Sequence, residues 1–280
     1  MDVQVEGPQH NGAWEHAPVV YVIGQVTFQP ILAIGTYLAT IQEKFRQAGF
    51  PLFETYHMQQ ITARLHGAGI EAIRQDPQDF WEMLTLDKRS AFLLSTSYLT
   101  FHTTAYVNFE AFADKLSMGL GYLLEVLGDV IPSRIGLRYV DFLSNGPELP
   151  LSSQIAPGLL GLSSNEIGAG GETSYQFQQV FSAGATTLVV RAIRGLGAET
   201  FKNSIGVTKL EFGKNAQSDP SMILDIDHSE ELVPSSFTTA KPLVDIFMAL
   251  QGLCRSAFLN ILTEDAQIYF QRSTDAASQP

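Results

Sequence analysis

Ten residues near the middle of the chain, Arg134-Ile-Gly-Leu-Arg-Tyr-Val-Asp-Phe-Leu143, place the strictest demand on any fold. Their pattern has the two-residue period of a β-strand. One face of that strand carries Ile135, Leu137, Tyr139, Asp141 and Leu143, and the other carries Arg134, Gly136, Arg138, Val140 and Phe142. Two arginines and an aspartate therefore lie among residues that favour burial. Because a buried charge needs a partner, the fold must supply one.

The chain before this strand has the pattern of an α+β unit. Strands are predicted by alternation and β-branched residues at 18–28, 52–66, 80–86, 91–96 and 98–106. Helices are predicted at 30–47 and 108–127 from apolar residues at helical spacing. Asn108 is a suitable N-cap for the second helix, and Gly128 is a suitable stop.

The chain after this strand repeats the same order of elements. Strands are predicted at 174–182, 187–193, 205–212 and 221–228, and a long amphipathic helix begins at Pro242. We therefore predict an α+β fold of two halves, each a curved antiparallel sheet packed on a long amphipathic helix. The predicted divisions are a leader 1–17, an N-terminal unit 18–144, a Gly/Ser-rich connection 145–172, a C-terminal unit 173–272 and a tail 273–280.

Composition limits the function and the setting. The formal charge is −12, from 17 basic and 29 acidic residues, and nucleic-acid binding needs clustered basic residues instead. Cys254 is the single cysteine, so the chain has neither a disulfide framework nor zinc-type spacing. No signal peptide is visible at 1–16, and no apolar run reaches the roughly 20 residues that span a bilayer. These features predict a cytoplasmic protein without a membrane partner.

Four pieces in order resemble an uncharacterised, sporadically distributed bacterial family of cytoplasmic proteins of about this length. They are Pro18-Val-Val-Tyr-Val22 with Val26-Thr-Phe28 before a helix, Phe80-Trp81, Tyr106 followed by Phe109 and Phe112, and Arg134-Ile-Gly-Leu-Arg-Tyr139. The resemblance covers residues 18–143 and extends to the second half by pattern. It implies a bacterial, cytoplasmic setting and supplies no catalytic residues.

Motifs that would carry chemistry are weak. Gly195-Leu-Gly197-Ala-Glu-Thr200 is half of a dinucleotide fingerprint and is interpreted as a surface turn. Asp225 and Asp227 share a strand face, which we interpret as solvated, while His228 points the other way. Cys254 lies on the long helix and is interpreted as a buried packing thiol. We expect no catalytic residue, no metal site and no cofactor.

The candidate binding residues are Arg134, Arg138, Tyr139, Asp141, His57 and His102. Arg138 has two interpretations. Its guanidinium suits a bidentate clamp on a carboxylate or phosphate of a ligand. It equally suits an internal ion pair, with Glu110, Glu125 or Asp141 as partner, and we favour the internal pair. The two histidines are interpreted first as hydrogen-bonded structural residues.

Two functional hypotheses follow from these patterns. The first is a non-catalytic binding or interaction protein, such as an inhibitor, an antitoxin-like protein or a regulatory partner of another protein. It follows from the lack of a catalytic constellation and from the acidic charge. The alternative is a small-molecule-binding domain or enzyme that uses a cavity between sheet and helix. The sequence leaves homo-oligomerisation open.

Overall fold

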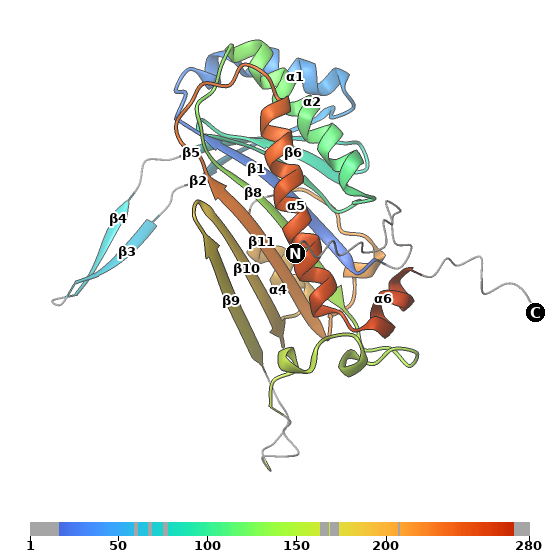
Figure 1. Cartoon of the computed structure of the whole chain (residues 1–280). Coiled ribbons are helices and arrows are strands. Elements are labelled where there is room, and N and C mark those ends of the chain that lie inside the picture. The colour runs from blue at the N-terminus through green and yellow to red at the C-terminus, as the bar shows by residue number, and fades with distance from the viewer. Residues whose placement is uncertain are drawn as a thin grey trace, which may run out of the picture.

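One antiparallel sheet forms the centre of the molecule. The computed structural model describes residues 17–58, 61–66, 69–74, 78–162, 168, 174–206 and 208–271. Its nine-stranded sheet has the order β2-β5-β6-β7-β1-β8-β11-β10-β9 (Figure 1). These strands are β1 (Val19–Phe28), β2 (Leu52–Met58), β5 (Gln78–Leu84), β6 (Ser90–Leu94), β7 (Tyr98–Thr103), β8 (Pro132–Leu143), β9 (Tyr175–Ala183), β10 (Thr186–Arg194) and β11 (Met222–Glu231). Strands β3 (Ile61–His66) and β4 (Gly69–Arg74) pair with each other in a separate hairpin.

The helices of the described residues are α1 (Ile34–Gln47), α2 (Phe109–Leu127), α4 (Ala198–Ser204), α5 (Lys241–Ile261) and α6 (Glu264–Gln271). Short 3₁₀ turns occupy η1 (Leu151–Ser153), η2 (Pro157–Leu159) and η3 (Lys214–Ala216). These elements confirm the α+β fold class, and β5, β6 and β7 lie side by side in chain order as an antiparallel meander.

The strand predicted at 134–143 lies in the middle of the sheet. It forms most of β8, which pairs antiparallel with β1 on one side and with β11 on the other. The β8–β11 pairing joins the strands of both predicted halves into a single sheet. The prediction of one sheet for each half is therefore wrong at this point, because β8 has a second free edge that the first half cannot satisfy.

Three long helices cover one face of the sheet, namely α1, α2 and α5 (Figure 1). That face presents the predicted apolar set of β8, including Ile135 and Leu137, both fully buried. Against it lie buried side chains such as Leu116 of α2 and Phe247 of α5. Each such side chain contributes about 1.5–3 kcal/mol by leaving water.

Helix α2 begins and ends where its sequence predicts. The Asn108 side-chain oxygen accepts a hydrogen bond from the Ala111 N–H at 2.9 Å, which satisfies one of the free donors of the first turn. At the other end Gly128 adopts φ +87°, a conformation that glycine tolerates without strain.

The opposite face carries a smaller core, in which Val140 and Phe142 of β8 pack with Phe201 of α4. Two predictions fail here. The expected turn at Gly195–Thr200 contains the start of α4, where the Asp219 Oδ1 accepts a hydrogen bond from the Ala198 N–H at 2.8 Å. The expected strand at 205–212 has no strand structure among its described residues, 205–206 and 208–212, because its polar groups bond to neighbouring strands and turns.

The described part of the connection, 145–162, packs against the end of α5. Leu151, Ile155 and Leu159 are buried. The Gln154 side-chain amide donates to the Ser144 and Leu149 carbonyl oxygens at 2.7 and 2.8 Å. The predicted leader and tail lie almost wholly outside the described residues, as does most of 163–173.

Helix α5 is the one described helix with the length and apolar character of a membrane span. It packs on the sheet through Leu243, Phe247, Leu250, Cys254 and Ile261, which are buried. Its other residues are half-buried or exposed, and the described residues supply no further candidate span.

Candidate functional site

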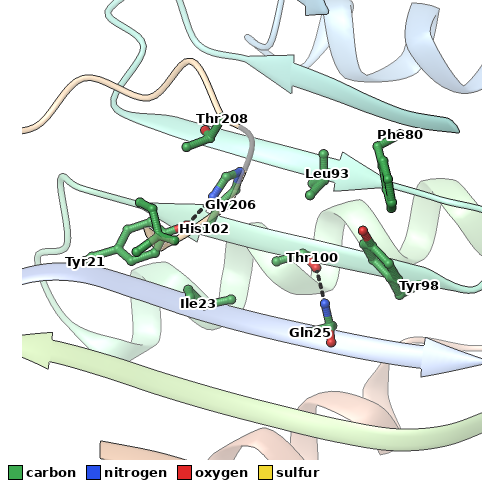
Figure 2. Close-up of a pocket in the computed structure, with 11 residues that line it drawn as sticks. Tyr21, Ile23, Gln25, Phe80, Leu93, Tyr98, Thr100, His102, Gly206 and Thr208 are labelled. Carbon is green, nitrogen blue, oxygen red and sulfur yellow. Dashed lines mark hydrogen bonds between the residues drawn. The ribbon is translucent and has the colours of Figure 1, made fainter. Parts of the chain in front are cut away.

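A pocket of about 290 Å³ opens on the face of the sheet opposite α1, α2 and α5 (Figure 2). Its floor comes from alternate residues of β1 and β7, which share a sheet face. Ile23 and Gln25 point into it from β1, and Thr100 and His102 from β7. Residues 205, 206 and 208 cross above this floor, so both predicted halves of the chain build the pocket.

One end of the pocket is aromatic. The rings of Phe80 from β5 and Tyr98 from β7 lie 5.9 Å apart between centroids and are tilted by 30°. Leu93 of β6 lies beside them (Figure 2). This end of the pocket therefore offers a flat, largely apolar surface.

The middle of the pocket offers hydrogen-bonding groups. The Gln25 side-chain amide donates to the Thr100 hydroxyl oxygen at 2.9 Å. This bond fixes the orientation of the amide. Among the described residues, no donor reaches the amide oxygen of Gln25, so that acceptor is available to a bound molecule.

A buried carboxylate lies beneath the other end. Glu82 of β5 is completely buried. It accepts hydrogen bonds from the Tyr56 hydroxyl at 2.7 Å and from the Lys209 N–H at 3.0 Å, and a third from the Thr208 hydroxyl. Burial alone would raise the pKa of Glu82, but the nearby His102 ring and the hydrogen bonds from the Thr208 and Tyr56 hydroxyls outweigh it and lower that pKa. Glu82 is therefore ionised at neutral pH.

His102 connects this carboxylate to Tyr21. Its Nδ1 lies 2.7 Å from the Tyr21 hydroxyl, in a hydrogen bond (Figure 2). Its Nε2 lies 3.4 Å from Glu82 Oε1, within ion-pair range but not aligned as a hydrogen bond. Burial raises the pKa of Tyr21 far above its usual range. The phenol therefore remains protonated and acts as a hydrogen-bonding group, and the three residues form a fixed polar wall.

The arginine of the central strand has an internal partner, as favoured, but not one of those predicted. Arg138 binds Asp225 of β11 in a bidentate ion pair, with Nε–Oδ1 and Nη2–Oδ2 distances of 2.7 and 3.0 Å. Arg191 of β10 binds the same carboxylate at 3.0 Å. Asp225 is buried, so the interpretation of its strand face as solvated is wrong.

The other predicted residues of β8 lie on both faces. Arg134 contacts Glu231 at 3.5 Å. On the helix-covered face, the Tyr139 hydroxyl lies 3.5 Å from that of Tyr106. Asp141 is also buried on that face, and no hydrogen bond reaches its carboxylate from the described residues.

Of the six candidates, His102 is the one that lines the pocket among the described residues. His57 is exposed and forms a hydrogen bond between its Nδ1 and Asp79 Oδ1 at 2.6 Å, away from the pocket. The sequence reasoning missed Tyr21, Gln25 and Glu82. A usable signal was present for Glu82, since it is a carboxylate between Trp81 and Met83 in a strand that is otherwise mostly apolar.

The described residues contain no group of three His, Cys, Asp or Glu side chains placed to hold a metal ion. Cys254 is buried, as predicted, and burial raises the pKa of its thiol to about 12. Comparison of the chain with known protein families and with curated proteins found no match.

Proposed function

We propose that this protein binds a small, uncharged molecule that carries a flat apolar ring and a hydrogen-bond donor. The observation that carries the proposal is the pocket on the back of the sheet, with its aromatic end and its free Gln25 acceptor. Its volume of about 290 Å³ lies at the small end of the roughly 300–1,000 Å³ that ligand pockets span. A molecule of one or two rings matches that size.

The chemistry of the lining supports an uncharged ligand. No Asp, Glu, Lys or Arg side chain belongs to the described lining. Glu82 lies behind the wall with its oxygens already engaged by three donors. A ligand charge would lose its water without gaining a counter-charge, which disfavours it.

The binding is proposed to be non-catalytic and cytoplasmic. The Glu82–His102–Tyr21 row contains no activated nucleophile, since Tyr21 remains protonated. Interaction with another protein stays a second proposal, supported by the charge of −12. Both predicted halves of the chain supply walls of the pocket, so the proposed binding needs both halves.

The test uses a library of one- and two-ring aromatic fragments, screened against the full chain by ligand-observed NMR. Leu93→Trp should fill the aromatic end and abolish binding. Gln25→Leu keeps the shape but removes the acceptor, and should weaken binding at least tenfold, as expected for an unpaired buried polar group on the ligand.

The matched control is Leu86→Trp, because Leu86 is 76% exposed and lies outside the pocket. This variant should bind the same fragments as the parent. Thermal melting checks that each variant is folded. Fragments that bind equally well to Leu93→Trp would place binding elsewhere, and a library without any binder would contradict the proposal.

A further inference from the structure

Strand β9 is an open edge of the nine-stranded sheet (Figure 1). Among the strands that the structure describes, it pairs with β10 alone, in a continuous register without a bulge. Its sequence, Tyr-Gln-Phe-Gln-Gln-Val-Phe-Ser-Ala, contains neither a charged residue nor a proline. Soluble proteins usually protect an edge with lysine, proline or a bulge, because its free backbone groups can pair with another strand. Edge β9 has none of these protections.

The opposite edge differs. Strand β2 carries the exposed Glu54, and its exposed His57 forms a hydrogen bond with Asp79. Charged groups on an edge strand discourage further pairing. The contrast singles out β9 as the edge that is open to a partner.

The turn after β9 fixes which backbone groups are free. Gly184 and Ala185 form a two-residue turn, with φ +59° at Gly184. The residues that flank such a turn, Ala183 and Thr186, form a hydrogen-bonded pair. Bonded and non-bonded pairs alternate along antiparallel strands. Odd-numbered residues of β9 therefore bond to β10, and even-numbered residues direct their N–H and C=O outward.

We propose that β9 pairs antiparallel with β9 of a second copy of this chain, about a two-fold axis at Gln179. In this register the outward groups of Gln178 meet those of Val180 of the second copy. Phe177 faces Phe181 of the second copy at a close, non-hydrogen-bonded position, where side chains contact best. The two sheets become one continuous sheet with both helix layers on the same side.

A second copy fits this edge for two reasons. A two-fold interface must be self-complementary, and the Gln179-centred register gives both phenylalanines of each copy an aromatic partner. Each copy carries a charge of −12, but β9 contributes none of it, so no charged side chain of the paired strands opposes the contact. The pairing also covers Val180 and Phe181, which are 52% and 49% exposed in the single chain.

The mass in solution gives the first test, measured by sedimentation equilibrium on the full chain. The parent should have about twice the 30.7 kDa of one chain. Val180→Pro removes an outward N–H without breaking a β9–β10 bond and should give a monomer. Gln179→Lys places two like charges opposite each other at the axis and should also give a monomer. Thr55→Lys makes the same kind of change on β2 and should remain dimeric.

Cross-linking tests the register. Non-hydrogen-bonded pairs bring Cα atoms to about 4.5 Å, which suits a disulfide. Gln179→Cys should therefore form a disulfide-linked dimer on mild oxidation, whereas Ser182→Cys, opposite Gln176, should not. Cys254 is buried and gives no background. A monomeric parent would overturn the proposal. A dimer that survives Val180→Pro and Gln179→Lys, or that pairs with a different protein at β9 instead of itself, would also overturn it.

Discussion

Asp225 is the shared counter-charge of two arginines in the central sheet. It is buried, yet it binds two arginines from the strands on either side, Arg138 of β8 and Arg191 of β10. The arginine side chains are 32% and 27% exposed, so each retains part of its hydration. Such a shared carboxylate tolerates the loss of one arginine better than the loss of both, because one cation still neutralises it.

We expect the two arginines to be coupled. Because the groups are partly exposed, Arg138→Ala alone should lower the free energy of unfolding by only about 1.5 kcal/mol, at the low end for a charged hydrogen bond. Arg138→Lys should recover only part of this loss, because lysine keeps the positive charge but lacks the planar guanidinium that binds both carboxylate oxygens. Arg138→Ala with Arg191→Ala leaves Asp225 as a buried charge without a partner, and should cost more than the sum of the two single losses, up to about 5 kcal/mol.

Urea denaturation of the two single variants and the double variant measures this coupling. Lys88→Ala, a change in an exposed turn, is the control and should have almost no effect. Strictly additive losses would contradict a shared carboxylate.

Asp141 should give the protein a pH-dependent stability. Burial and the nearby charge of Asp225 raise the pKa of Asp141 to about 8, whereas an unfolded chain has about 3.9. The folded protein therefore binds this proton more tightly. The free energy of unfolding falls as the pH rises from about 4 to about 8 and is not lowered further by this group above that range.

Asp141→Asn should remove this dependence. At pH 8.5 the variant should be more stable than the parent by on the order of several kcal/mol, and the difference should shrink towards pH 5. Urea midpoints at pH 5, 7 and 8.5 measure it, with the exposed Asp114→Asn as control. A constant difference across this range would show that Asp141 does not titrate in it.

At the scale of elements, helix α2 contains a natural pair of tests. A Cβ on Gly119 would lie 2.2 Å from the Phe92 ring of β6, whereas a Cβ on Gly121 meets no atom within 4 Å. The helix therefore packs on the sheet at Gly119 and is open at Gly121.

Gly119→Ala should destabilise the protein by about 1–3 kcal/mol, the usual range for overpacking a core. Gly121→Ala should stabilise it by about 0.5–1 kcal/mol, because alanine is the better helix former. Both values follow from urea denaturation under the same conditions. Equal effects of the two changes would mean that α2 does not approach β6 as described.

The elements also show how far sequence reasoning reaches. Period and capping predicted both faces of β8 and both ends of α2, because those signals lie within one element. The partner of Arg138 is 87 residues away, and only the register of β8 with β11 brings it near. The pocket has the same origin, since residues as far apart in the sequence as Tyr21 and Thr208 line it together. The misassigned strand at 205–212 has apolar residues at 205, 207, 210 and 212, so its two-residue period breaks between 207 and 210. In the structure the Glu211 N–H bonds to the Lys88 carbonyl oxygen of a turn instead of to a strand.

At the scale of the whole molecule, the two predicted halves are joined by strand pairing and by hydrogen bonds. Strands β8 and β11 pair along their length, from Leu143 opposite Met222 to Arg134 opposite Glu231. The second half also supplies the Lys209 N–H that bonds to the buried Glu82 of the first. Separation of the halves would leave that carboxylate short of donors and the edge of β8 open, and both changes cost free energy.

The halves should therefore unfold together. In a Trp14→Phe variant, tryptophan fluorescence reports Trp81, which is buried in the first half, while far-ultraviolet circular dichroism reports both halves. The two urea transitions should coincide within error, as two-state unfolding requires. The fragment 18–144, expressed alone, should lack a cooperative transition because β8 has lost its neighbour. Two separated transitions, or a stably folded fragment, would mean that each half is a domain in its own right and that the pocket forms between two independent units.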